Sequence, residues 1–290
     1  MVVVAAFYQF AEFPDFATHK EQLAKVGCSN GVRGSILLAH EGINGTIAGP
    51  RKGVDAVLSA IRAIPVFSDL QHKESTAEEM PFRRLKIRLK KEIVAFGVPV
   101  DAVNDVGDYV EPEDWNRILD DPELIVVDAR NDYETAIGMF DGSIDPDTKS
   151  FRDLPTRLDA LARDSGKDRI AMYCTGGIRC EKATAYARQL GFKEIYHLKG
   201  GILKYLERVP AEESRWKGEC FVFDDRVALR HGLQETGHTA CRACGRAVSV
   251  EGRNDPHYEE GVSCRHCYSL YTDQDRERFR ERHRQMSHTP

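Results

Sequence analysis

A short stretch around Cys174 constrains the fold of this chain more than any other feature of the sequence. The stretch is residues 173–182 (YCTGGIRCEK), and the apolar residues 170–173 before its cysteine are typical of a central strand. Apolar residues recur at helical spacing over residues 183–190, until Gly191 ends the pattern. We therefore expect Cys174 at the carboxyl end of a buried strand, in a loop that leads into a helix.

The composition of this loop predicts a reactive thiolate. Two glycines allow successive backbone N–H groups to turn inward, and such a nest at a helix amino terminus binds anions. A thiol that faces these amides and the Arg179 guanidinium should have a pKa below the free value of about 8.5. We predict Cys174 as a nucleophile with Arg179 as its charged partner; a buried inert cysteine is the alternative. The other residues of the predicted active-site loop are Thr175, Gly176, Gly177 and Ile178.

Two Cys-x-x-Cys pairs mark the carboxyl-terminal part of the chain. Cys241 and Cys244 form the first pair, Cys264 and Cys267 form the second, and 19 residues separate the pairs. This spacing is typical of zinc ribbons, in which each pair makes a knuckle and the intervening loop lets the knuckles face each other. Four thiolates fill the tetrahedral coordination of Zn²⁺, so we expect a structural ion with no open position for substrate. Two disulfides or an iron–sulfur centre are the alternatives.

The overall composition indicates a globular protein of a reducing compartment. The 290 residues are 41% hydrophobic and 30% charged, which is ordinary for folded domains. The apolar residues 1–8 lack a basic lead and precede polar residues, so we interpret them as a strand and not as a signal peptide. No run approaches the roughly 18 apolar residues of a membrane span. Because most of the eight cysteines belong to the predicted metal and nucleophile sites, we expect a cytoplasmic protein. We expect no membrane partner, and no obligate protein partner is evident from the sequence.

Residues 1–97 alternate between strand and helix patterns in the order βαββαβ, which is the split ferredoxin-like unit. The expected strands are residues 2–8, 34–38, 45–47 and 85–95, and the expected helices are residues 15–26 and 51–63. Residues 42–45 (GING) suit a hairpin turn between the second and third strands, because Asn-Gly tolerates positive φ. We expect a linker over residues 98–110, a second domain over residues 111–210, and the cysteine-rich region with a basic tail over residues 211–290.

The last expected strand of the first domain is strongly basic. Residues 83–91 hold six cations and no acid. Leu85, Ile87 and Leu89 should face the core, which leaves the alternating cations on the opposite face at intervals of about 6.6 Å. Such a ladder matches a phosphate backbone, so we predict RNA binding there, against the alternative of a solvated strand face. The predicted RNA-binding residues are Arg83, Arg84, Lys86, Arg88 and Lys90.

The Cys174 loop and its flanks resemble the rhodanese superfamily over residues 111–208, where four residues separate the loop cysteine from its arginine. Residues 124–134 resemble the rhodanese strand with its Asp-x-Arg turn, and residues 195–201 resemble the last strand with its glycine turn. Related phosphatase loops carry one more residue to enclose a phosphate, so this length favours a sulfur-sized ligand or direct attack by cysteine. The resemblance implies an α/β chain with a ferredoxin-like α+β domain, a central rhodanese-like doubly wound parallel α/β domain, and a small zinc-binding segment with four cysteine ligands.

Taken as a whole, the sequence resembles the bacterial tRNA uridine hydroxylases. The matching segments are residues 41–46, 151–155, 174–183 and 218–224, followed by the paired cysteines. That family makes 5-hydroxyuridine at the wobble position of tRNA with molecular oxygen. The resemblance therefore implies an oxidoreductase that modifies the tRNA anticodon loop, with Cys174 as the catalytic cysteine. The chain has no Gly-x-Gly-x-x-Gly cofactor fingerprint, so the electron donor is unknown from the sequence.

Two other functions are compatible with the sequence. A rhodanese-type sulfurtransferase would work through a Cys174 persulfide, and the same amides and Arg179 would stabilise that anion. A noncatalytic RNA-binding adaptor is the third possibility. Cys180 likewise has two compatible roles, as a structural residue at the helix start or as a thiol that resolves an oxidised Cys174.

Overall fold

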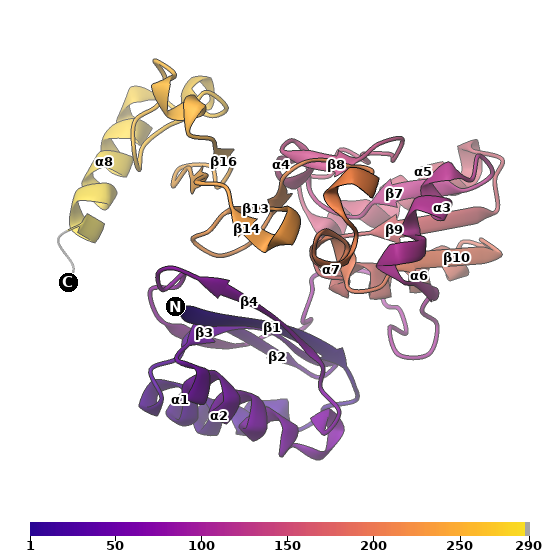
Figure 1. Cartoon of the computed structure of the whole chain (residues 1–290), viewed down its shortest axis with the longest axis horizontal. Helices are drawn as coiled ribbons and strands as arrows, with labels where there is room; N and C mark the ends of the chain where they lie inside the picture. Colours follow the sequence, from indigo (N-terminus) through magenta and orange to yellow (C-terminus); the bar gives the residue numbers. More distant parts are fainter. Residues whose placement is uncertain (288–290) are drawn as a thin grey trace.

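The computed structural model describes residues 1–287, which form three parts in chain order (Figure 1). The first part is a sheet flanked by two helices, and its elements are β1 (Val2–Phe10), α1 (Lys20–Ser29), β2 (Arg33–Ala39), β3 (Gly42–Gly49), α2 (Arg51–Arg62), β4 (His72–Ala77) and β5 (Leu85–Leu89). The strand order is β4-β1-β3-β2-β5. All neighbours pair antiparallel except β5, which joins β2 in parallel. This confirms the ferredoxin-like expectation, with one additional edge strand.

The strand that completes the ferredoxin-like unit is β4 and not the predicted residues 85–95. Its sequence, HKESTA, has no alternation of apolar and polar residues, so no pattern in the sequence reveals it. It pairs with β1 from Val2↔Ala77 to Phe7↔His72. The basic strand β5 is shorter than predicted, ends at Leu89, and lies at the opposite edge of the sheet.

The predicted hairpin turn in this domain is also wrong. The hairpin turn is His40-Glu41, and the predicted turn residues 42–45 lie inside β3. Gly42 is needed for close strand packing, because a Cβ there would lie 2.1 Å from the Gln9 carbonyl oxygen. Leu89 shares the core side of the sheet with its partner Leu38, as predicted, but is 41% exposed because it is the last residue of an edge strand.

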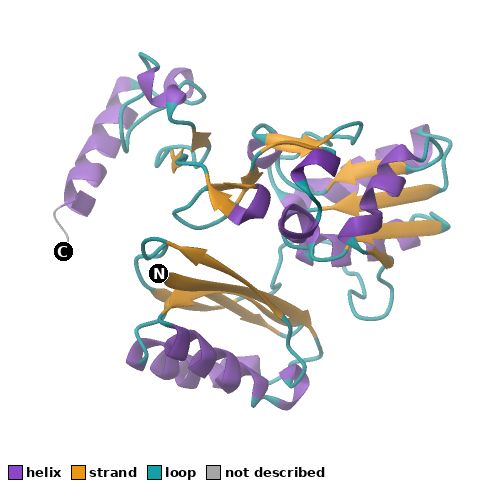
Figure 2. Ribbon diagram, viewed as in Figure 1, coloured by secondary structure: helices purple, strands orange, loops and turns teal. Residues whose placement is uncertain are grey.

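Both helices of this domain cover one face of the sheet (Figure 2). In α2, the buried residues Val54, Val57, Leu58 and Ile61 recur at helical spacing and pack in the core against Phe7 and other sheet residues. Side chains on one strand alternate between the two sheet faces. The side chains on the face opposite the helices can therefore contact the second part of the molecule.

The second part is a parallel four-stranded sheet with helices on both faces. Its main elements are β6 (Asp108–Val110), α3 (Trp115–Asp120), β7 (Ile125–Asp128), α4 (Asp132–Thr135), β8 (Gly138–Phe140), α5 (Leu154–Asp164), β9 (Arg169–Tyr173), α6 (Ile178–Gln189), β10 (Glu194–Leu198) and α7 (Gly201–Arg208). The sheet order is β6-β10-β9-β7. One apolar core packs α5 and α6 on one face, and a second packs α3 and α7 on the other. The doubly wound expectation is confirmed.

The third part consists of short strands and one long helix. Its elements are β11 (Trp216–Gly218), β12 (Cys220–Phe221), β13 (Ala228–Arg230), β14 (Gln234–Glu235), β15 (Thr239–Ala240), β16 (Ala247–Val248) and α8 (Asp273–Ser287). Strand β11 pairs with β8, which ties this part to the parallel domain. Short 3₁₀ turns occur at Phe16–His19, Pro65–Phe67, Pro112–Asp114, Phe151–Asp153, Ala211–Glu213, His231–Leu233, Glu251–Asn254 and Tyr268–Leu270.

The helix-free face of the first sheet is turned toward the second domain (Figure 1). Side chains on this face bond to both other parts: Tyr8 to Glu181 and Lys73 to two carbonyls of the second domain, and Ser75 to Arg226 of the third part. The contacts between the first two domains therefore lie directly beside the predicted active loop.

Within residues 1–287, no helix has the length and apolar character needed to cross a membrane.

Candidate active site

Cys174 follows β9 directly, and α6 begins four residues later at Ile178. Gly177 has a φ of 105°, a conformation that a residue with a side chain rarely adopts. Its backbone N–H donates to the Cys174 Sγ with an N···S distance of 3.1 Å. The Cys174 side chain is fully buried, at 0% exposure. The loop amides are thus directed at the sulfur itself.

The surroundings lower the pKa of Cys174 to about 5. Burial opposes this shift, because it disfavours the charged thiolate. A hydrogen bond from the Cys180 thiol, the positive charge of Arg179, and the amides of Cys180 and Gly177 together outweigh burial. Burial and the neighbouring Cys174 raise the pKa of Cys180 well above its ordinary value, so Cys180 stays protonated and can donate. Cys174 is accordingly a thiolate at neutral pH.

Arg179 acts on the sulfur through its charge, while its hydrogen bonds go to Glu134 and Thr175. Its Nη1 and Nη2 lie 2.6 and 2.8 Å from the two carboxylate oxygens of Glu134. The Thr175 hydroxyl accepts from Arg179 and donates to Glu134, which closes a three-residue network. Glu134 is held in turn by a capping box with Asn131 at the start of α4. This network fixes the loop, and the importance of Glu134 is not evident from the sequence.

Beside the loop lies a buried carboxyl group that the sequence analysis missed. Glu181, in the first turn of α6, accepts hydrogen bonds from the Tyr8 hydroxyl at 2.8 Å and the Tyr109 hydroxyl at 2.9 Å. Burial raises the pKa of Glu181 to about 7; the two tyrosine hydrogen bonds oppose this shift and the Cys174 charge adds to it. Glu181 follows Cys180 in the sequence, where an acid at a helix start is ordinarily explained by the helix dipole. The only sequence signal for a role of Glu181 was therefore its place directly after the predicted loop.

Lys73 is a second functional candidate that the sequence analysis missed, because it lies on the unpredicted β4. Its Nζ donates to the carbonyl oxygens of Gly176 at 2.6 Å and Gly200 at 2.5 Å. Burial lowers the pKa of Lys73 to about 8, and the charge of Cys174 opposes this shift. Lys73 thus brings a cation from the first domain to the predicted active loop.

An exposed aromatic ring lies on the Arg179 side of the loop. Phe223 is 64% exposed, and its ring centroid is 5.9 Å from Cζ of Arg179. The chain around it is anchored to the first domain, because Arg226 donates to the Ser75 hydroxyl at 2.8 Å and the Asp225 amide donates to the Pro81 carbonyl. The segment 221–226 of the third part therefore contacts both the first domain and Arg179 of the second domain.

The predicted RNA-binding cations are all exposed, and those on β5 share a sheet face with Tyr8. Register defines a cross-strand row Tyr8–Asn44–Leu37–Arg88, in which each residue is the direct partner of the next. Directly paired residues lie on the same face of a sheet. Three strand spacings of about 4.8 Å separate the ends of this row, so the Arg88 backbone lies about 14 Å from that of Tyr8.

A second row extends this relationship to Lys73 and Lys86. The partners along it are Lys73, Ala6, Thr46, Ser35 and Lys86. Within residues 1–287, no acidic side chain forms an ion pair with Arg84, Lys86, Arg88 or Lys90. The charges of these residues are therefore available on the face that meets the Cys174 loop.

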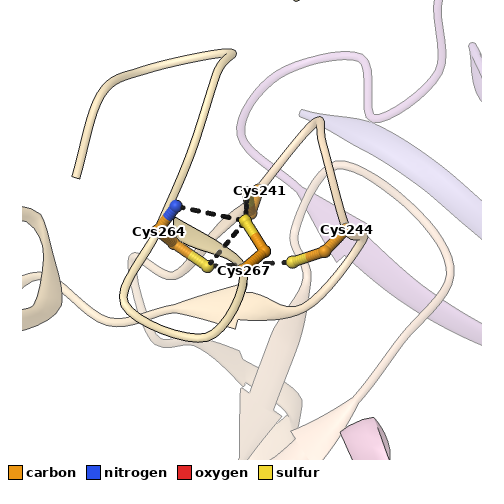
Figure 3. Close-up of side chains that lie close together, drawn as sticks. All are labelled: Cys241, Cys244, Cys264 and Cys267. Atoms are coloured by element: carbon orange, nitrogen blue, oxygen red, sulfur yellow. Dashed lines mark hydrogen bonds between the residues drawn. The ribbon is translucent and has the colours of Figure 1, made fainter. Parts of the chain in front are cut away.

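The four cysteines of the third part gather as the sequence predicts (Figure 3). The Sγ–Sγ distance is 3.8 Å for Cys241–Cys267 and Cys264–Cys267, and 3.7 Å for Cys244–Cys264. A tetrahedron with Zn–S bonds of about 2.3 Å has edges of about 3.8 Å. A disulfide needs about 2.05 Å, so the two-disulfide alternative does not fit. The cluster suits one four-coordinate metal ion.

Comparisons with known proteins agree with this architecture. A family model described as "UPF0176 acylphosphatase like domain" matches residues 2–93, and one described as "Rhodanese-like domain" matches residues 111–208. Proteins named tRNA uridine(34) hydroxylase from Sinorhizobium fredii and Agrobacterium fabrum are each 57% identical to the chain, over 98% of it and 91% of their own lengths. The protein of that name from Brucella anthropi is 52% identical, over 98% of this chain and 93% of its own. At this identity and coverage, the chain belongs to the tRNA uridine(34) hydroxylase family.

Proposed function

We propose that this protein is a cytoplasmic oxidoreductase that hydroxylates C5 of the wobble uridine 34 of tRNA, with molecular oxygen as co-substrate. Relatives that carry this name align with nearly the whole chain. The structural observation that carries the proposal is the Cys174 thiolate, which meets the Gly177 amide at 3.1 Å and whose pKa is lowered to about 5. Such a group is a nucleophile at neutral pH without help from a base.

The first chemical step in this proposal is addition of the Cys174 thiolate to C6 of the uridine. The S–C6 bond forms, the C5=C6 π bond breaks, and its electron pair moves to C5 and the O4 enolate. C5 gains carbanion character, and C5 is where the hydroxyl group must be introduced. Oxygen supplies the new oxygen atom, and a two-electron donor that the sequence does not assign reduces the other oxygen atom to water. Arg179 and the loop residues 175–178 keep the sulfur anionic and oriented.

Access to the sulfur requires movement between the domains. Cys174 is fully buried, and Tyr8 and Lys73 of the first sheet bond to residues around it. Enzymes that act on a base extrude it from its stack into a pocket. In our proposal the first domain moves away from the loop, admits the extruded uridine, and closes again over the adduct.

We propose that the anticodon loop runs from the Cys174 pocket along the helix-free face of the first sheet. Its phosphates would contact the β5 cations Lys86 and Arg88 together with Arg84, Lys90 and the adjoining Arg83. The cross-strand rows support this path, because they put the cations on one face with Tyr8, which lies beside the Cys174 loop. Residues 1–97 would thus bind RNA, and residues 111–210 would carry the chemistry.

We further propose that Cys241, Cys244, Cys264 and Cys267 hold a structural Zn²⁺. The sulfur–sulfur distances match a tetrahedral thiolate site, and four protein ligands leave no position for substrate. The apolar cluster around them is small, so a metal is needed to stabilise this part.

The proposal is tested by trapping the C6 adduct. Purified protein is incubated with tRNA that carries 5-fluorouridine at position 34, where fluorine blocks the loss of the C5 substituent. The expected result is a covalent protein–RNA complex that survives denaturation and is absent in Cys174→Ser. Mass spectrometry of tRNA nucleosides from a deletion strain separates the alternatives. Loss of 5-hydroxyuridine derivatives supports the hydroxylase. Loss of 2-thiouridine would indicate a sulfurtransferase, and an unchanged set of nucleosides would indicate a noncatalytic adaptor.

A further inference from the structure

The half-buried Tyr8 and the buried Glu181 form a hydrogen-bonded pair beside the Cys174 loop. The proposed thiolate addition gives this pair no role. The Tyr8 hydroxyl donates to Glu181 Oε1 at 2.8 Å, although 173 positions separate the two residues in the chain. A Cβ at Gly177 would lie 2.7 Å from the Tyr8 hydroxyl oxygen, and the Gly177 amide contacts Cys174 Sγ. The phenol therefore lies against the residue that holds the sulfur.

Glu181 is not needed to activate the thiol. The loop amides, the Cys180 thiol and Arg179 already lower the pKa of Cys174 to about 5, despite burial. Burial raises the pKa of Glu181 to about 7, so this carboxyl group can take up and release a proton at neutral pH. The ionisable groups that act on it are Tyr8 from β1, Lys73 from β4, Tyr109 from β6 and Cys174 from the loop.

After hydroxylation, one proton must still be removed from the uridine adduct before the product can be released. After oxygen is added, the uridine adduct carries sulfur at C6 and both a hydroxyl group and a hydrogen at C5. Release of 5-hydroxyuridine requires removal of the C5 proton. The C–H electron pair then forms the C5=C6 double bond, and the C6–S bond breaks to regenerate the Cys174 thiolate. This elimination needs a base and no oxidant or reductant.

We propose that Tyr8 and Glu181 are the base of this elimination: the Tyr8 oxygen takes the C5 proton while its own proton passes to Glu181. The inference rests on the proposed function, because it acts on the C6 adduct of that mechanism. Tyr8 is the catalytic residue, since it is the member of the pair that lies against the loop. Glu181 is a positioning residue and proton acceptor behind it, and Tyr109 holds its second oxygen at 2.9 Å.

This assignment gives the first domain a part in the chemistry. Tyr8 lies on β1, so the site has its base only when the helix-free sheet face is closed on the loop. Lys73 holds that closed arrangement through the carbonyls of Gly176 and Gly200. The active site is thus completed by two domains, and the rhodanese-like domain alone lacks the proposed base.

The test compares Tyr8→Phe and Glu181→Gln in the full-length protein, under single-turnover conditions with tRNA bearing tritium at C5 of uridine 34. Both variants should release tritium at least about 10²-fold more slowly than wild type, the usual size of a general-base effect. The hydroxylated adduct should accumulate on Cys174, as a covalent complex on a denaturing gel and as a modified peptide by mass spectrometry. The wild-type rate should rise with pH through about 7, and this inflection should be lost in Glu181→Gln.

Matched measurements separate this inference from folding and from the proposed function. Tyr186 lies on the same helix as Glu181, and Tyr186→Phe removes a similar tyrosine–carboxylate bond, to Asp159 of α5. This variant should keep the wild-type rate. Both test variants should still trap 5-fluorouridine tRNA, which shows intact folding and addition. Wild-type tritium release in either variant, or slowing without accumulated adduct, overturns the assignment of the pair. Full hydroxylation by Cys174→Ser would instead overturn the proposed function.

Discussion

Two groups of cysteines in this chain show opposite uses of the same side chain. Cys174 stands before a helix, with amides and a positive charge directed at one sulfur. The cluster of Cys241, Cys244, Cys264 and Cys267 brings four sulfurs within 4.8 Å of one another. In the first group the protein stabilises one negative charge with its own dipoles. In the second group backbone amides also donate to sulfur, as from Cys264 to Cys267 at 3.4 Å, but the four sulfurs lie close enough together to share one metal ion.

A comparison of Cys174 with Cys180 shows that burial alone does not define the role of a cysteine. Cys174 and Cys180, in the first turn of α6, are both fully buried, yet the pKa of Cys174 is lowered and that of Cys180 is raised. What separates them is the direction of the hydrogen bonds, because Cys180 donates and Cys174 accepts. Reactivity therefore follows the donors that surround a sulfur, not its exposure.

The largest effect should come from Cys174→Ser. Loss of the nucleophile should lower the rate of 5-hydroxyuridine formation by about 10³-fold or more, measured by nucleoside mass spectrometry after single turnover. Metal content and thermal unfolding should stay as in wild type. Cys28→Ser, at an exposed cysteine in α1, is the matched control and should keep full activity. Wild-type activity in Cys174→Ser would show that Cys174 is not the nucleophile, and the proposed difference in role between the two cysteine groups would be wrong.

Cys267→Ser should have the opposite pattern of effects. It should strongly disturb the structure of the third part and leave the reactivity of the Cys174 thiolate nearly unchanged. Structural zinc binding is worth about 10–16 kcal/mol in small peptides, more than a small apolar cluster can supply. The variant should lose its metal, and the amides of residues 239–287 should lose protection in hydrogen exchange. Trapping of 5-fluorouridine tRNA by Cys174 should persist. Wild-type protein purified without chelator but free of any metal would contradict this prediction.

Neutralising Arg84, Lys86, Arg88 and Lys90 should have an intermediate effect, on binding only. Each phosphate contact contributes about 0.7 to 0.9 to the slope of log affinity against log salt. The quadruple glutamine variant should therefore flatten the slope for tRNA by about three units. A matched control neutralises four cations that are paired with acids: Arg117, Lys149, Lys193 and Arg215. Equal slopes for the variant and wild type would exclude β5 from the RNA path.

The smallest signal is the titration of a single thiolate. Because the folded pKa of Cys174 is about 5, its thiolate should persist at pH 7 and disappear as the pH falls through about 5. The difference in absorbance near 240 nm between wild type and Cys174→Ser isolates this group from the metal-binding sulfurs. A midpoint near the ordinary thiol value of about 8.5 would mean that the loop amides and Arg179 do not outweigh burial.

Much of the fold follows from local patterns in the sequence. The strand, loop and helix around Cys174 are predictable because residues 170–191 carry apolar periodicity and glycines at the places where the chain turns. The cysteine pairs predict their cluster because their spacing alone defines two knuckles. In each case the signal lies within about 30 consecutive residues.

The parts that could not be predicted depend on contacts between distant segments. Strand β4 is polar, and only its pairing with β1 makes it a strand. The Tyr8–Glu181 bond joins two domains, and in the sequence Tyr8 is one more residue of an apolar strand. Lys73 has no neighbouring residue that marks it as special, because its partners are backbone carbonyls in another domain.

If RNA follows the path that we propose, the cross-strand row from Tyr8 to Arg88 has a consequence for substrate choice. Neighbouring strands cannot slide apart without breaking their hydrogen bonds, so the spacing of about 14 Å between the two backbones is fixed by the sheet. An RNA held at both ends of this row must place a phosphate at a set distance from the base that enters the pocket. Selection of this kind depends on the contour of the RNA backbone and is indifferent to the identity of the bases between. A tightly folded loop and an extended strand of the same sequence would then be told apart by geometry.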